Sequence, residues 1–142
     1  MKLSALYQIF LDCQSVTTDS RNCPDGSLFI ALKGESFNGN AFAKLALDSG
    51  CAFAIIDEIQ YAIEGDQRYI LVDDCLQTMQ QLANYHRRQL GTRVIGITGT
   101  NGKTTTKELI SSVLCQAHNV LYTLGNLNNH IGVPTTLLRL KP

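Results

Sequence analysis

The chain has 142 residues, 44% of them hydrophobic, and its twelve basic and twelve acidic residues give a formal net charge of zero. This balance argues against nucleic acid as a partner, because the phosphate backbone selects proteins with excess positive charge. The apolar runs are all shorter than the roughly 20 residues that cross a bilayer, and the N-terminal stretch lacks the pattern of a signal peptide. We therefore expect a cytoplasmic protein without a membrane span.

The cysteines and histidines lie far apart in the sequence. The five cysteines form no CxxC pair, and their spacing fits neither a disulfide framework nor a zinc site. We expect reduced thiols in or near the core. His86 and His118 are interpreted as residues of a helix surface or a loop, and neither is assigned a role.

Hydrophobic periodicity and turn residues predict an α/β pattern of two helices and three strands over the first 75 residues. In chain order these are a helix at 3–11, a strand at 27–33, a helix at 41–50, and strands at 51–57 and 68–74.

A longer helix is predicted from Asp74, a plausible N-cap, to Gly91, a helix-ending residue. Its apolar residues form one stripe, and Arg87 and Arg88 lie in the last turns, where the helix dipole favours cations. We interpret this helix as a bridge that ends a first domain at residue 90.

Residues 91–142 repeat the α/β pattern. The expected elements are a strand at 93–98, a glycine loop, a helix at 104–116, a strand at 119–123, an asparagine-rich loop and a helix opened by Pro134. A strand, helix and strand of this length form a parallel crossover unit. Two strands are too few for a stable parallel sheet. Either the chain is a piece of a longer protein, or its tail packs on the first domain or on another copy.

The loop GTNGKTT at residues 99–105 has the features of a phosphate site. Backbone N–H groups and the positive end of a helix dipole converge at such a strand-to-helix junction. Lys103 would contact the terminal phosphates of a nucleotide, and the Thr104 hydroxyl would bind Mg²⁺. The standard Walker spacing requires glycine where this chain has Ile97. A tight turn with an incidental lysine is therefore the alternative.

Three stretches, GITGTNGKTTTKELI, TLGNLNNHIGVPTTLLRL, and DSR followed by GSLFIALKGESFNGN, together resemble the Mur ligases. The ATP loop of that family, G-[TS]-[NS]-G-K-[TS], accounts for the departure from the Walker spacing. The resemblance implies a small N-terminal α/β substrate-binding domain at 1–90. It is followed at 91–142 by the first strand, P-loop, helix and strand of a parallel-sheet ATP-binding domain, which is truncated.

The resemblance also implies a reaction, because the asparagine segment resembles the branch that adds D-alanyl-D-alanine to UDP-N-acetylmuramoyl-tripeptide in peptidoglycan synthesis. In that ATP-dependent amide ligation, ATP with Mg²⁺ phosphorylates the tripeptide carboxylate, and the amine of D-alanyl-D-alanine attacks the acyl phosphate. The family's later acidic metal ligand and its C-terminal domain lie outside this sequence. We therefore expect the 142-residue chain alone to be inactive as a ligase.

Site residues follow from the same resemblance. The ATP-binding set is Gly99, Thr100, Asn101, Gly102, Lys103, Thr104 and Thr105. Within it Lys103 and Thr104 are the catalytic pair, and Thr104 is the Mg²⁺ ligand. The set expected to contact the UDP substrate is Ser20, Arg21, Asn38, Gly39, Asn126, Asn128 and Asn129.

Alternatives remain open for each assignment. Asp19 to Arg21 could be a capped turn with a surface arginine, and the asparagines could satisfy the backbone of their own loop. Another ligase of the superfamily, such as a folylpolyglutamate synthetase, is a rival, although those lack a separate uridine-binding domain. A rival of a different class is a non-catalytic module that binds a UDP-muramoyl peptide or a nucleotide.

Overall fold

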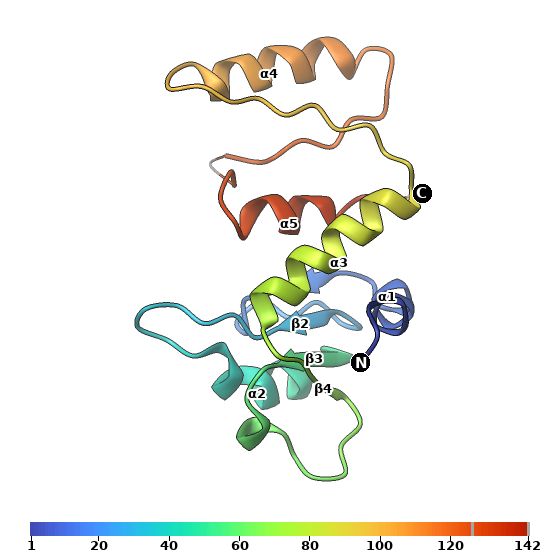
Figure 1. Ribbon diagram of the computed structural model, residues 1–142, viewed down its shortest axis with the longest axis vertical. Helices are drawn as coiled ribbons and strands as arrows, with labels where there is room; N and C mark the ends of the chain where they lie inside the picture. The colour runs from blue at the N-terminus through green and yellow to red at the C-terminus, as the bar shows by residue number, and fades with distance from the viewer. Residues whose placement is uncertain (126, 142) are drawn as a thin grey trace.

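The computed structural model describes residues 1–125 and 127–141 (Figure 1). Its body is a four-stranded sheet in the order β1-β2-β3-β4, with every neighbouring pair parallel. The strands are β1 (Val16–Thr17), β2 (Leu28–Ile30), β3 (Phe53–Ile56) and β4 (Tyr69–Leu71). This confirms the predicted α/β class and the three predicted strands, to which the structure adds β1.

Among the described residues, five α-helices and two 3-10 turns accompany the sheet. They are α1 (Leu3–Asp12), η1 (Gly39–Phe42), α2 (Ala43–Asp48), η2 (Ile59–Tyr61), α3 (Cys75–Gln89), α4 (Lys103–Leu114) and α5 (Gly132–Leu137). Figure 1 shows α2 below the strands, α3 crossing above them, and α4 at the far end of the molecule. The predicted helices are all confirmed, with bounds that differ by a few residues.

The core lies between the sheet and the helices that cover it. Leu28, Ile30, Ile55 and Ile56 are completely buried, and α2 packs on β2 and β3 while α1 packs on α3. A parallel sheet covered on both faces requires such continuous apolar runs rather than alternation. Each of these side chains contributes about 1.5–3 kcal/mol on burial, so this region is the main source of stability.

The bridging helix α3 has the predicted ends. The Asp74 carboxylate accepts a hydrogen bond from the Gln77 N–H at 2.7 Å, which confirms the N-cap. Gly91, just past the helix, has φ 63°, in the left-handed region where a side chain would be strained.

His86 corrects one expectation. Its side chain is only 2% exposed, on the buried stripe of α3. The Tyr7 hydroxyl lies 3.1 Å from Nδ1, and the Leu140 carbonyl oxygen lies 3.0 Å from Nε2. The interpretation as a residue of a helix surface or a loop was wrong, because Tyr7 of α1 and Leu140 of the tail meet at the His86 ring. His118 is exposed, as expected.

The two strands predicted at 93–98 and 119–123 are also corrected. Within the described residues both segments run without ladder hydrogen bonds, and only α4 forms between them. A strand exists through its pairing with a neighbour, and neither segment pairs with the other or with the sheet. Figure 1 shows both as unpaired chain on the α4 side of the molecule.

The tail packs on the first region, one of the alternatives left open by the sequence. Helix α5 lies against α3, and Leu138 is 5% exposed within the main core. Pro134 lies inside the first turn of α5 rather than opening it. The N–H groups of the first helical turn have no acceptor within the helix, so proline, which lacks an N–H, is tolerated there.

The five cysteines are free thiols, and four of them are buried or half-buried, as expected for reduced cysteines near a core. The fifth, Cys115, is exposed and departs from that expectation. Burial raises the pKa of the Cys75 thiol to about 12, so this thiol stays protonated. Among the residues described, no helix combines the length and the apolar character needed to cross a membrane.

Candidate functional site

One hollow of about 400 Å³ opens at the carboxyl ends of β1 and β2. Ligands in parallel sheets bind at this edge, where the loops that follow neighbouring strands converge. Two loops line the hollow together with the β2 residue Phe29, and their lining residues are Thr18, Asp19, Ser20, Arg21, Phe37, Gly39 and Phe42. The structure therefore brings together three residues of the predicted UDP-substrate set, Ser20, Arg21 and Gly39.

The loop after β1 is a tight turn organised by Asp19. Its carboxylate accepts a hydrogen bond from the Arg21 N–H at 3.0 Å and two from the Arg21 guanidinium at 2.9 Å each. The hydrogen bonds from the side chain and the backbone of Arg21 lower the pKa of Asp19 to about 2. The alternative of a capped turn thus describes the local geometry, and the same turn places an arginine with an 87% exposed side chain at the hollow.

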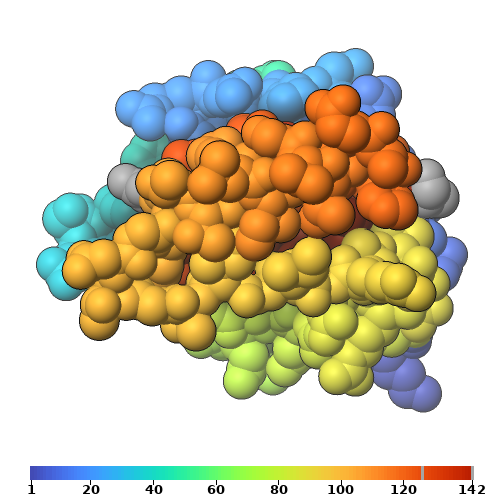
Figure 2. All heavy atoms as spheres, turned by 90° about the horizontal axis from the view of Figure 1, so that it is seen from above, coloured from blue at the N-terminus to red at the C-terminus, as the bar shows by residue number. Residues whose placement is uncertain are grey.

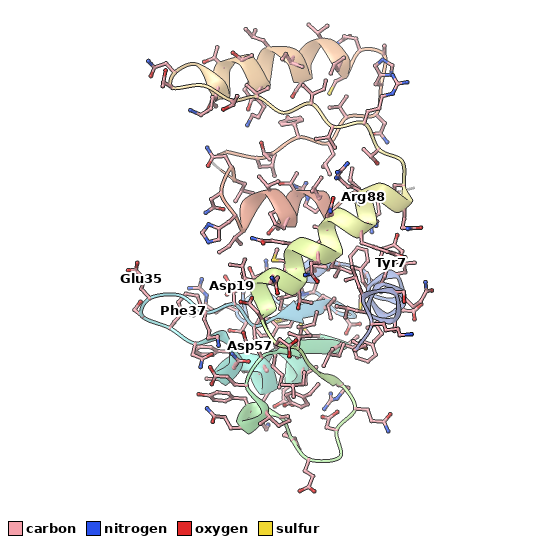
Figure 3. All side chains as sticks on the ribbon, in the orientation of Figure 1. Tyr7, Asp19, Glu35, Phe37, Asp57 and Arg88 are labelled. Atoms are coloured by element: carbon pink, nitrogen blue, oxygen red, sulfur yellow. The ribbon has the colours of Figure 1, made fainter. Side chains whose placement is uncertain are left out.

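The loop after β2 supplies an aromatic wall. Phe37 and Phe42 are 55% and 43% exposed, and both line the hollow. Gly39 lies so close to the preceding strand segment that a Cβ there would overlap the Leu32 carbonyl oxygen. Glycine is therefore required at this position by close backbone approach. Figure 3 shows Phe37 on the projecting loop whose tip is Glu35.

Asn38, predicted as a substrate contact, does not line the hollow. Its Oδ1 accepts hydrogen bonds from the backbone N–H and the side-chain amide of Asn40, and its Nδ2 donates to Glu58 Oε1 at 3.1 Å. Asn38 is the N-cap of η1. Its contact with substrate stays a prediction.

The glycine loop before α4 leads into a helix whose first backbone N–H groups have no side-chain cap. Gly102 is the N-cap of α4 with φ 73°, and no side chain caps the helix. The first N–H groups of an α-helix have no partner within it, so they can donate to an anion. The Lys103 ammonium bends back to the carbonyl oxygens of Gly99 and Thr100, which keeps a positive charge beside those N–H groups. The predicted ATP-binding residues thus run through one loop and the first turn of α4, and all are exposed except the half-buried Lys103.

Thr104 is the second residue of α4 and is exposed. A single hydroxyl provides one oxygen ligand, and the described residues contain no cluster of three His, Cys, Asp or Glu side chains. Mg²⁺ commonly binds through few protein ligands together with substrate phosphates and water. The residues present therefore fit a Mg²⁺ ion only where most of its ligands come from the phosphates of a bound nucleotide and from water.

The asparagine loop precedes α5. Asn129 Oδ1 accepts hydrogen bonds from the N–H groups of Ile131 at 3.2 Å and Gly132 at 2.7 Å, so the alternative that these asparagines satisfy their own loop holds for Asn129. Asn128 is exposed. Asn126 lies outside the described residues, and all three substrate assignments stay predictions.

Lys107 is a residue that the sequence reasoning missed. Its ammonium donates to the Thr123 carbonyl oxygen at 2.6 Å and lies 3.1 Å from Glu108 Oε1, with its side chain 13% exposed. The ammonium also lies 5.8 Å from the centre of the Tyr122 ring. Lys107 thereby ties the helix of the phosphate loop to the chain that leads into the asparagine loop. The sequence feature that could have identified Lys107 is its position one helical turn after Lys103.

Comparison with known proteins finds two family models along the chain. One, described as "Mur ligase family, catalytic domain", matches residues 12–87. The other, described as "Mur ligase middle domain", matches residues 97–142. Together they cover both regions that contain the predicted site residues.

Curated relatives are similar over most of the chain. The UDP-N-acetylmuramoyl-tripeptide--D-alanyl-D-alanine ligase of Bacillus subtilis is 48% identical over 87% of this chain and 27% of its own length. The ligase of the same name from Escherichia coli is 43% identical over 90% of this chain and 28% of its own length. The chain thus spans little more than a quarter of these relatives.

Solved structures are similar to nearly the whole fold. A MurF crystal structure from Acinetobacter baumannii aligns with a TM-score of 0.84 at 35% identity, over 99% of this chain and 33% of that one. The MurF ligase from Thermotoga maritima in complex with ADP aligns with a TM-score of 0.81 at 31% identity, over 93% of this chain and 30% of that one.

Proposed function

The chain belongs to the Mur ligase family, and from this premise we propose that it binds a UDP-N-acetylmuramoyl-tripeptide at the hollow beyond β1 and β2 and a nucleotide at residues 99–105. The observation that best supports the first site is that Ser20, Arg21 and Gly39, from two separate loops, line one hollow. The activity we propose for the whole protein is ATP-dependent ligation of D-alanyl-D-alanine to that tripeptide. Domains at 1–90 and 91–142 are part of the same proposal.

The residues of the hollow suit a nucleotide diphosphate. The Arg21 guanidinium is always charged and donates in a fork that matches phosphate oxygens. Asp19 holds this fork on two of its N–H groups, so the remaining donors are oriented before any ligand arrives. Phe37 and Phe42 offer ring surface of the kind on which a base can stack.

ATP, when bound with Mg²⁺, would supply the phosphoryl group that activates the substrate carboxylate. The Lys103 ammonium would then leave the carbonyl oxygens of its own loop for the phosphates. The free N–H groups of the first turn of α4 would donate to the same phosphates, and the Thr104 hydroxyl would hold the ion. Such groups would act by position and charge.

Calorimetric titration of this chain with UDP-N-acetylmuramoyl-tripeptide, and with UDP alone, tests the substrate site. We expect binding that weakens in Ser20→Ala, because the hydroxyl at the hollow is lost. Ser49→Ala, an exposed serine away from the hollow, is the matched control and should bind as the unchanged chain does. No binding by a chain whose circular dichroism is that of a folded protein would refute the site.

Phosphate release tests the activity separately. We expect this 142-residue chain to bind without ligating, because it spans less than a third of its relatives. Release of phosphate that requires both D-alanyl-D-alanine and the tripeptide nucleotide would show that the chain is itself a ligase.

A further inference from the structure

We infer that Asn40 is a positioning residue for the nucleotide hollow, and that it fixes the loop at 33–42 by bonding it to Asp57 at the end of β3. This inference rests on the proposed substrate site. Asn40 does not itself line the hollow, whereas its neighbours Gly39 and Phe42 do. It would therefore act through them.

The Asn40 side chain uses both of its polar ends. It is 1% exposed, and its Nδ2 donates to Asn38 Oδ1 and to Asp57 Oδ1, each at 2.8 Å. Its Oδ1 accepts from the Asp57 N–H at 2.9 Å. Two donors and an acceptor on one short side chain are a property of the amide. A carboxylate of the same shape would replace the two donors by a second acceptor.

Asp57 anchors this bridge to the body of the fold. Its side chain is 5% exposed, lies 3.0 Å from the Lys33 ammonium and accepts from the Cys75 N–H at 3.2 Å. Burial by itself would raise the pKa of Asp57, but the hydrogen bonds from Asn40, Lys33 and Cys75 outweigh it and lower the pKa. Asn40 thus bonds to a fixed anion that joins β3 to the start of α3.

A second set of contacts closes the base of the loop. Lys33 lies 3.2 Å from Glu58 Oε1, which also accepts from Asn38 Nδ2. Beyond this base the loop projects into solvent. Glu35 lies at its tip, and Phe37 lies on the part of the loop that leads back to the base (Figure 3). The aromatic wall therefore depends on the base for its place, because Phe37 and Phe42 flank the bonded residues.

The test compares Asn40→Asp with the matched control Asn84→Asp, which adds the same charge at an exposed position of α3. Affinity for UDP-N-acetylmuramoyl-tripeptide is measured by calorimetry at about pH 8 and about pH 5. At the higher pH the introduced carboxylate faces Asp57, so we expect affinity to fall by about tenfold or more while the control is unchanged.

At the lower pH the two carboxylates can share one proton, which restores a hydrogen bond. The variant should therefore recover much of its affinity relative to the unchanged chain at the same pH. The charged groups around the pair are Lys33 and Glu58, and both are retained in the variant. If Asn40 acted only by filling space, and not through its hydrogen bonds to Asp57, lowering the pH would not restore the affinity of the variant.

Amide hydrogen exchange of residues 33–42, measured without ligand, separates this inference from the proposed function. We expect faster exchange in Asn40→Asp and no change in the control. Unchanged exchange, or equal affinity of variant and unchanged chain, would overturn the inference. If the unchanged chain does not bind at all, the proposed function fails, and the inference fails as a statement about ligand positioning. Should Asn40→Asp not fold, Asn40→Ser is measured in the same way at one pH, with the same outcomes deciding.

Discussion

Residues 1–90 and residues 91–130 alternate strand-like and helical patterns in the same way, yet within the part of the chain that the structure describes only the first region forms a sheet. In the first, Leu82 on α3 is completely buried, whereas in the second, Leu109 and Val113 on α4 are 64% and 71% exposed. Figure 2 shows the second region as one outer face of the molecule. The difference teaches that an apolar run becomes a strand only where a neighbouring strand completes its ladder.

Helices α3 and α4 also differ in how they begin. Helix α3 starts with a capping carboxylate from Asp74, whereas α4 starts at Gly102 with no side-chain cap. A capped helix is stable without a ligand, and an uncapped one keeps its N–H groups available for an anion. Helix α3 thus begins with a side-chain cap, whereas α4 begins with open backbone donors.

The largest expected effect comes from truncating one leucine in each region. Leu82→Ala should lower the free energy of unfolding by about 3 kcal/mol, because it removes buried contacts and leaves a cavity. Leu109→Ala, the matched change on α4, should stay within about 0.5 kcal/mol. Urea denaturation followed by circular dichroism measures both. Equal losses would mean that α4 is buried in solution.

A smaller effect is expected at the contact between the tail and the first region. His86→Ala should cost about 2 kcal/mol, because the Tyr7 hydroxyl and the Leu140 carbonyl lose their partner. Amide exchange should then quicken in residues 132–140 more than in α4. His118→Ala is the control at an exposed site. A tail whose exchange is unaltered by His86→Ala would show that the contact does not hold it.

The N-cap comparison predicts a change of about 1 kcal/mol. Asp74→Ala should destabilise the chain by that amount, since the Gln77 N–H loses its acceptor. Asp73→Ala, next to it and also exposed, should leave the unfolding midpoint in urea nearly unchanged. If both substitutions cost the same, the effect is one of charge and not of capping.

The smallest expected effect concerns how steeply stability falls with pH in the acid range. The folded-state pKa of Asp57 is lowered from 3.8, so this group contributes stability that is present above that pH and is lost as the pH falls through the lowered value. Asp57→Asn should therefore flatten the acid limb of a stability profile, measured as urea midpoints from about pH 5 to about pH 2. Asp73→Asn is the control. An acid limb as steep in Asp57→Asn as in the unchanged chain would exclude this contribution.

The sequence by itself determined the parts of this protein that depend on local chemistry. The spacing of apolar residues located α1 and α3, Asp74 and Gly91 marked the ends of α3, and the glycine loop before Lys103 predicted a phosphate site. The residues of the family motifs led to Ser20, Arg21 and Gly39, which line one hollow. The helix ends and the glycine loop are readable because each depends on neighbours within a few positions along the chain. Ser20, Arg21 and Gly39 were found only through the family resemblance.

Only the tertiary structure decided what depends on distant partners. Residues 93–98 and 119–123 have strand-like sequences and no ladder, which no local pattern reveals. His86 is buried because Tyr7 and Leu140 meet at its ring, and these two residues lie 79 and 54 positions away from it in the sequence. Asn38 and Asn40 read as loop residues, and their roles come from Asp57 and Glu58 at the end of another strand. Contacts of this kind form when strands and helices pack, so they are set by the fold rather than by the residues beside them.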